Sequence, residues 1–320
     1  MTVGAAWTRR SGNGEELWIA SDSRLSGDEN IWDVCPKLMP LPRRDAVAGF
    51  SGSTTQAYPL LLQLSNAIGS YRSAADGTMD FFQLVKHLER VANSLMSSIK
   101  PDPQITGAID SRTEFSTTGD TVVLGGYSRI EGRIGLYSLR YVASELRWHF
   151  STIRPKTALG RSRLIAIFGD RKSKSRYRYL LQKLLEERGT LKSSISFDFE
   201  PFEVLASMLL MPTSIASRLP LDRRPTTIGG APQLVRVLPG AQATAVAVMW
   251  DHAGNSTVHL QGRPTFEYEN LDVPLLTIEE SGLTIYGPSH WPEDVIRNRR
   301  DVQSPDQADE LETLIKVKNR

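Results

Sequence analysis

The sequence predicts an α+β protein built from antiparallel sheets rather than from alternating β–α units. Strand-like and helix-like segments are grouped with their own kind, in the order four strands, two helices, four strands, two helices and three strands. Short turn signals join neighbouring strands, and the clearest is Ser11-Gly12-Asn13-Gly14. With 40% apolar and 23% charged residues, the chain of 320 residues can fill a sizeable core.

Composition also excludes several classes of function. The formal net charge is +2, so no global electrostatic argument favours nucleic acid or a membrane surface. No run of 18 apolar residues predicts a membrane span, and no signal-peptide layout opens the chain. The single cysteine, Cys35, and five histidines without ligand spacing predict no metal site, and no nucleotide-binding loop or other cofactor motif occurs. We expect a cytoplasmic protein.

The first strands are short and joined by turn residues. Thr2 to Trp7 and Leu17 to Ser21 form the first predicted hairpin, with a loop from Asp22 to Asp33 after it. Lys37 to Leu41 and Ala46 to Phe50 form the second. These first fifty residues carry all the chemistry singled out below.

The remaining elements follow from periodicity. Apolar residues at helical spacing predict two helices between residues 54 and 98, and Pro101 and Pro103 end the second. Residues 101 to 120 are a predicted loop. The later elements are strands at Thr121 to Tyr127, Ile134 to Val142, Arg147 to Phe150 and Leu164 to Phe168, helices at Lys172 to Glu187 and Glu200 to Met211, and strands at Gln233 to Leu238, Thr244 to Trp250 and Thr257 to Leu260.

No linker divides these elements, so we predict one domain over residues 2–262. Residues 263–320 are a C-terminal extension, spotted with prolines and then charged, whose last part we expect to be partly flexible.

Four residues near the start could act together. Removal of the initiator Met, expected before a small residue, would leave Thr2 with a hydroxyl nucleophile and an α-amine whose pKa is about 7.7–8.0. A cation such as Lys37 would lower the pKa of that amine, and Asp22 could hold the lysine. Gly49, in a predicted turn, could direct its N–H at an oxyanion.

The order of these residues resembles a family pattern. Thr2, Ala20-Ser21-Asp22-Ser23-Arg24, Lys37-Leu38 and Ala48-Gly49-Phe50-Ser51-Gly52-Ser53-Thr54 are similar to the motifs of the proteasome β-subunit superfamily, including the HslV and Anbu types. The resemblance implies a four-layer αββα sandwich, two antiparallel sheets between helix pairs, assembled as a homo-oligomeric ring. It also implies peptide or unfolded protein substrates and a separate ATPase partner, because this chain has no nucleotide-binding loop.

The resemblance assigns roles by position. Thr2 would be the nucleophile, Lys37 would tune its amine, Asp22 would hold Lys37 with Arg24 beside it, and Gly49 would donate to the oxyanion. Ser21 and Ser51 flank these positions and are candidate binding residues. The chain departs from the pattern in a first hairpin four residues longer, which as an even insertion preserves side-chain facing.

Further departures affect the expected support of the site. The family's supporting serine would fall at Phe168-Gly169-Asp170, and its late aspartate near Pro225, ahead of Gly229-Gly230. An alternative register, set by Gly4, leaves no threonine at the nucleophile position.

Three functions therefore stay open. The first is a threonine-type endopeptidase that cleaves through an acyl-enzyme. The second is a non-catalytic ring or regulatory subunit of the same fold, which the missing serine and aspartate favour. The third is a non-proteolytic amidase with an N-terminal nucleophile, whose pocket the longer first hairpin would reshape.

Overall fold

A computed structural model describes residues 2–12, 14–27, 30–52, 54–98, 121–145, 147–154, 163–191, 193, 195–210, 228–240, 243–252, 255–266, 268–279 and 282–296. In these ranges, none of the helices combines the length and apolar character needed to span a membrane. The predicted loop at residues 101–120 lies outside the described residues.

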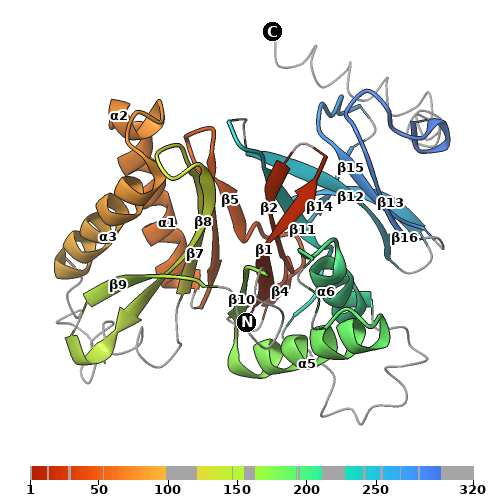
Figure 1. Cartoon of the computed structure of the whole chain (residues 1–320), viewed down its shortest axis with the longest axis horizontal. Coiled ribbons are helices and arrows are strands. Elements are labelled where there is room, and N and C mark those ends of the chain that lie inside the picture. Colours follow the sequence, from red (N-terminus) through yellow and green to blue (C-terminus); the bar gives the residue numbers. More distant parts are fainter. Residues whose placement is uncertain are drawn as a thin grey trace, which may run out of the picture.

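Two separate sheets organise the chain, and both are seen in Figure 1. The larger has nine strands and contains both the first and the last strand of the described chain. Its main path, in spatial order, is β10 (Ile165–Gly169), β1 (Val3–Ser11), β2 (Gly14–Ser21), β11 (Gln233–Val237), β12 (Thr244–His252), β13 (Asn255–Leu260) and β14 (Arg263–Pro264). Off this path, β15 (Leu275–Glu279) pairs with β12 and with β16 (Gly282–Tyr286).

The smaller sheet has five strands in sequence order. They are β5 (Leu38–Pro40), β6 (Ala46–Ser51), β7 (Thr121–Ser128), β8 (Arg133–Val142) and β9 (Arg147–Thr152). Every pair in this sheet is antiparallel. A 3-10 turn, Ala143–Glu145, lies between β8 and β9.

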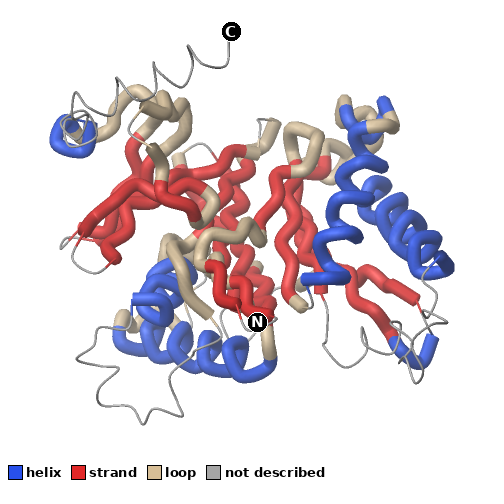
Figure 2. The backbone as a smooth tube through the Cα atoms, turned by 180° about the vertical axis from the view of Figure 1, so that it is seen from behind, coloured by secondary structure: helices blue, strands red, loops and turns tan. Residues whose placement is uncertain are grey.

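Helices pack on the outer face of each sheet, as Figures 1 and 2 show from opposite sides. The helices are α1 (Thr54–Gly69), α2 (Arg72–Ala75), α3 (Phe81–Ser98), α5 (Arg171–Glu187) and α6 (Glu200–Leu210). The start of α5 is capped by Asp170, whose side chain accepts a hydrogen bond of 3.0 Å from the Ser173 amide. Gly189, at φ +66°, ends the same helix in the left-handed region.

Alternation along the strands separates three of the four apolar cores of the described chain. Val3, Ala5 and Trp7 of β1 pack with α5 and α6, whereas Ala46 and Ala48 of β6 pack with α1 and α3. The opposite faces of the two sheets meet in a third core, formed by residues such as Ala6, Leu17, Ile19, Leu38, Val47, Val123, Phe168 and Val235. The predicted α+β class with antiparallel sheets is therefore observed.

The structure corrects the sequence prediction in two places. Residues 22–33 were expected to be a loop, yet they contain β3 (Leu25–Gly27) and β4 (Asn30–Trp32) in a two-stranded hairpin. One pair of the larger sheet, β12 with β15, is parallel, because the chain crosses over before β15. Beyond residue 262 the chain adds β14, β15 and β16 to this sheet. The domain boundary at residue 262 stays a prediction.

Candidate active site

A buried ion pair lies where the two sheets meet. Asp22 follows β2 directly and Lys37 precedes β5 directly, and Lys37 Nζ lies 2.9 Å from Asp22 Oδ1. The side chains are 1% and 0% exposed, so this pair is among the most enclosed charges of the described chain. The structure thus brings together two of the predicted site residues that are 15 positions apart.

The carboxylate of Asp22 is held by backbone groups as well as by the lysine. Its Oδ1 accepts a hydrogen bond of 3.0 Å from the Val3 amide, and its Oδ2 accepts one of 3.3 Å from the Gly229 amide. Burial raises the pKa of Asp22 and lowers the pKa of Lys37, while their mutual attraction acts against both shifts. Three groups from three parts of the chain therefore converge on one carboxylate.

Thr2 lies at the entrance of β1, next to this cluster. The residue is 3% exposed, and its carbonyl oxygen accepts a hydrogen bond of 3.0 Å from the Asp170 amide. The Asp22 amide donates to the carbonyl of Val3 at 3.1 Å, so β1 and β2 stay paired up to the residue after Thr2. The nucleophile candidate is therefore adjacent in the chain to an amide that binds the Asp22 carboxylate.

The longer first hairpin does not disturb this end of the sheet. Pairing runs without a break from Gly4 opposite Ser21 to Ser11 opposite Gly14. Ser11 and Gly14 are paired although only two residues separate them in the sequence, so extra length in this hairpin is divided equally between its two strands. Such an even division keeps each side chain on its own face of the sheet.

Gly49 lies inside β6, between β5 and β7, rather than in a turn. The amide of Phe50 donates to the carbonyl of Lys37 at 3.2 Å, and the amide of Tyr127 donates to the carbonyl of Asp45 at 3.1 Å. Because hydrogen-bonded and non-hydrogen-bonded pairs alternate in antiparallel strands, the N–H of Gly49 faces its partner Val123 in β7. This amide is used by the sheet and does not face Lys37.

Packing explains why position 49 is a glycine. A Cβ atom there would stand 3.0 Å from side-chain carbons of Ile19 and Leu38, and 3.2 Å from the Phe168 ring. The Phe168 ring also covers Gly4, where a Cβ would stand 2.3 Å from it. Both glycines therefore let the two sheets approach closely around one aromatic ring.

The three candidate binding residues have structural partners. The hydroxyl of Ser21 donates to the Val3 carbonyl at 3.2 Å. Arg24 forms a two-point ion pair with Asp33, at 2.6 and 2.8 Å. Ser51 is the last residue of β6, opposite Thr121, and is buried. Their role toward a substrate stays a prediction.

Gln233 is a buried residue of the site that sequence reasoning missed. Its Oε1 accepts hydrogen bonds from the amides of Lys37 and Leu38, at 2.8 and 3.1 Å. Its Nε2 donates to the carbonyl of Cys35 at 2.6 Å. One side chain from β11 thereby fixes the backbone that delivers Lys37 to Asp22. The only signal was a glutamine at the start of a strand whose other residues, apart from Arg236, are apolar.

The position where a supporting serine was expected holds a glycine, and a second glycine, Gly229, contacts the ion pair. Gly169, at φ +128°, is so close to Thr2 that a Cβ would stand 2.1 Å from the Thr2 carbonyl oxygen. Gly229 donates to Asp22 and its carbonyl accepts from the Ser23 amide at 3.1 Å. Residue 225 lies outside the described residues, so the expected late aspartate position is not placed.

Asp170 adds a carboxylate close to Thr2. Its Oδ1 caps α5, whereas its Oδ2 is buried without a hydrogen-bond partner among the described residues. Asp170 faces Thr2 across β1 and β10, because the Asp170 amide donates to the Thr2 carbonyl. The Oδ2 atom without a partner therefore belongs to the residue opposite Thr2.

The described residues contain no group of three or more histidine, cysteine, aspartate or glutamate side chains arranged to hold a metal ion. Cys35 is a free, buried thiol, and burial raises its pKa. The chemistry available at this site is therefore that of the hydroxyl of Thr2, the Asp22–Lys37 pair and backbone amides.

Comparison with known proteins shows a distant likeness to solved structures. No family model matches the chain. The search of curated proteins finds no match either. Among solved structures, a mutant of Anbu from Hyphomicrobium sp. strain MC1 is similar at a TM-score of 0.46 and 13% sequence identity. The likeness covers 76% of this chain and 85% of that one. Because this TM-score is below 0.5, the likeness does not assign a function to this chain.

Proposed function

We propose that this chain is a threonine-type endopeptidase of the N-terminal-nucleophile class. In this proposal its sheets and helices form a four-layer αββα sandwich over residues 2–262, with residues 263–320 as an extension. The observation that carries the proposal is the buried Asp22–Lys37 pair, because the same carboxylate binds the amide next to Thr2. Burying two charges is costly, and a charge pair beside a potential nucleophile is a candidate functional arrangement.

The proposed reaction begins once Met1 is removed. The α-amine of Thr2 takes the proton from its own hydroxyl, and Oγ attacks the scissile carbonyl carbon. The amine then passes the proton to the leaving nitrogen as the C–N bond breaks, which leaves an acyl ester on Thr2. A water molecule, deprotonated by the same amine, hydrolyses this ester and restores the hydroxyl.

Lys37 supports the amine in this mechanism. Its positive charge lowers the pKa of a nearby ammonium group, so that more of the Thr2 amine is neutral near pH 7. Asp22 and Gln233 hold the lysine in place, through its side chain and its backbone respectively. Neither residue has to touch the substrate.

Stabilisation of the oxyanion by Gly49 requires a change in the sheet. Gly49 can donate to it only if its pairing with Val123 opens when substrate binds, because its amide faces β7 in this structure. Ser21 and Ser51 then flank the substrate, and Arg24 holds the loop after β2 through Asp33.

A second candidate function is a non-catalytic subunit of the same fold. The engaged amide of Gly49 and the glycine at position 169, where a serine was expected, favour it. In both readings we propose a cytoplasmic homo-oligomeric ring. A separate ATPase would supply unfolded protein to the peptidase.

The test begins with the intact mass of the purified chain, which reports whether Met1 has been removed. A peptide epoxyketone should then form a covalent adduct that maps to Thr2. Thr2→Ala should abolish both the adduct and the cleavage of short peptide amides, whereas Thr2→Ser should retain measurable cleavage. Retained Met1, or an adduct unaffected by Thr2→Ala, would reject the peptidase and leave the non-catalytic subunit. Turnover of small amides but not of peptides would instead support the amidase.

A further inference from the structure

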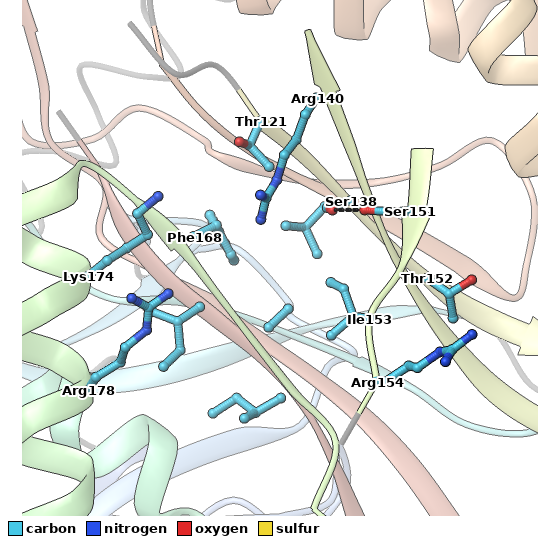
Figure 3. A pocket seen from close by; sticks show the side chains of 14 residues that line it. Thr121, Ser138, Arg140, Ser151, Thr152, Ile153, Arg154, Phe168, Lys174 and Arg178 are labelled. Atoms are coloured by element: carbon cyan, nitrogen blue, oxygen red, sulfur yellow. Dashed lines mark hydrogen bonds between the residues drawn. The ribbon is translucent and has the colours of Figure 1, made fainter. Parts of the chain in front are cut away.

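A cavity lies between the two sheets, and neither Asp22 nor Lys37 lines it. It has a volume of about 220 Å³ and is open to solvent on one side. Its walls are β10, strands β7 to β9, and the first turns of α5 (Figure 3). Pockets that hold drug-sized ligands measure roughly 300–1,000 Å³, so this one suits a compact group.

Positive charge dominates this cavity. Of the 14 residues that line it, Arg140, Arg154, Lys174 and Arg178 are cationic and none is acidic. None of these four side chains forms an ion pair with any residue that the structure describes. Elsewhere on the surface, arginines such as Arg24, Arg188 and Arg263 are each paired with a carboxylate.

Three of the cations face one another across the cavity. Figure 3 shows Lys174 and Arg178 on the α5 side and Arg140 entering from β8, with Arg154 at the far wall. Burial lowers the pKa of Lys174, and repulsion from Arg140 and Arg178 lowers it further. An anion that enters the cavity lowers the free energy of this arrangement, because the cations then have an opposite charge nearby.

We propose that this cavity binds a phosphate-class oxyanion, either free phosphate or the phosphates of a nucleotide. A phosphate or pyrophosphate carries two or more negative charges and several acceptor oxygens, which match cations on separate walls. A single carboxylate would leave most of this positive charge without a partner. Thr121 and Thr152 also line the same space.

This site is independent of the proposed peptidase. Its four cations have no role in that mechanism, although Val123, which lines the cavity, pairs with Gly49, and Thr2→Ala should leave the site intact. Failure of one proposal therefore does not decide the other.

The experiment is calorimetric titration of the full chain, at constant ionic strength in chloride buffer, with inorganic phosphate, pyrophosphate and ATP as separate probes. We expect saturable binding at one site per chain, at least tenfold tighter for pyrophosphate than for phosphate. ATP as tight as pyrophosphate would identify a nucleotide as the source, whereas much weaker ATP would identify the free anion. Either result supports the site.

Matched variants locate the binding. Lys174→Gln/Arg178→Gln should weaken pyrophosphate binding at least tenfold, and so should Arg140→Gln from the opposite wall. Arg171→Gln/Lys172→Gln removes the same charge from exposed positions of α5 outside the cavity and should change affinity less than twofold. Absence of binding at millimolar phosphate and pyrophosphate overturns the proposal. Equal losses in both double variants, or preference for an acidic peptide over all three probes, also overturn it.

Discussion

The two sides of the candidate active site differ in how their polar groups are used. On the Lys37 side, the side chains of Asp22 and Gln233 both hydrogen-bond to Lys37, and all three residues are fully buried. On the Gly49 side, the amide that should meet an oxyanion is part of the ladder with β7. The Lys37 side is therefore a cluster of hydrogen-bonded polar side chains, whereas the Gly49 side consists of backbone pairing within the sheet and apolar packing.

This difference bears on catalysis because the two sides do different work. Activation of a nucleophile needs a fixed charge nearby, and a cluster whose polar groups all have partners supplies one. Stabilisation of an oxyanion needs a donor that is unused before the reaction. A chain with only the first side would bind its N-terminus firmly and still react slowly, so the sharpest experiments change one side and compare it with the other.

The largest effect is expected at the ion pair itself. Lys37→Ala leaves Asp22 charged and enclosed with no cation, and breaking a buried pair in this way costs about 3–5 kcal/mol of the free energy of unfolding. Asp22→Asn/Lys37→Met removes both charges and should cost clearly less than Lys37→Ala. Urea denaturation followed by circular dichroism measures both. Equal losses would show that the charges are not coupled.

The next largest effect is expected at Gln233. Gln233→Leu leaves the amides of Lys37 and Leu38 and the carbonyl of Cys35 without their partner, and each unsatisfied buried group costs about 1–3 kcal/mol. We expect a loss of at least about 2 kcal/mol in urea denaturation, together with a raised pKa of the Thr2 amine in the pH profile.

Gln261→Leu is the matched control, because the side chain of Gln261 has buried polar atoms with no partner in the described chain. It should change stability little or raise it. A Gln233→Leu variant as stable as this control would contradict the role assigned to Gln233.

The glycines test the packing side of the comparison. A Cβ on Gly4 would meet the Phe168 ring at 2.3 Å and the Ala20 carbonyl oxygen at 2.7 Å, and the backbone oxygen has little freedom to move. A Cβ on Gly49 would meet only side-chain carbons, at 3.0 Å or more. Gly4→Ala should therefore cost about 1–3 kcal/mol and Gly49→Ala less, both measured by urea denaturation. The reverse order would refute this account of the shared ring.

Local patterns explain what the sequence could predict. The turn at Ser11 to Gly14 set the first hairpin, and helical spacing set α1 and α3, because these signals lie within a few residues. The close approach of Asp22 and Lys37 followed from the resemblance and not from periodicity. The β3–β4 hairpin was missed because its two strands have only three residues each and show no clear alternation.

Long-range pairing explains what the sequence could not predict. The direction of the Gly49 amide depends on the register of β6 against β7, two strands separated by a long stretch of chain. Gln233 reaches Lys37 across 196 positions, and no local pattern marks such a contact. The cationic cavity likewise joins side chains from β8 and α5, which only the folded sheets bring together.

The smallest expected effect concerns the backbone just before Lys37. The hydroxyl of Tyr58 in α1 donates to the Pro36 carbonyl at 2.9 Å, and burial raises the pKa of Tyr58 to about 12. Tyr58→Phe should cost about 0.5–1 kcal/mol near pH 8, since one hydrogen bond is lost.

A raised tyrosine pKa stabilises the protein fully below the ordinary pKa of 10, and this contribution is lost as pH rises through about 12. The difference between wild type and Tyr58→Phe in urea denaturation should therefore shrink between pH 9 and pH 11. Tyr179→Phe, at an exposed position of α5, should match wild type throughout, and a Tyr58 difference that does not change with pH would disprove the link.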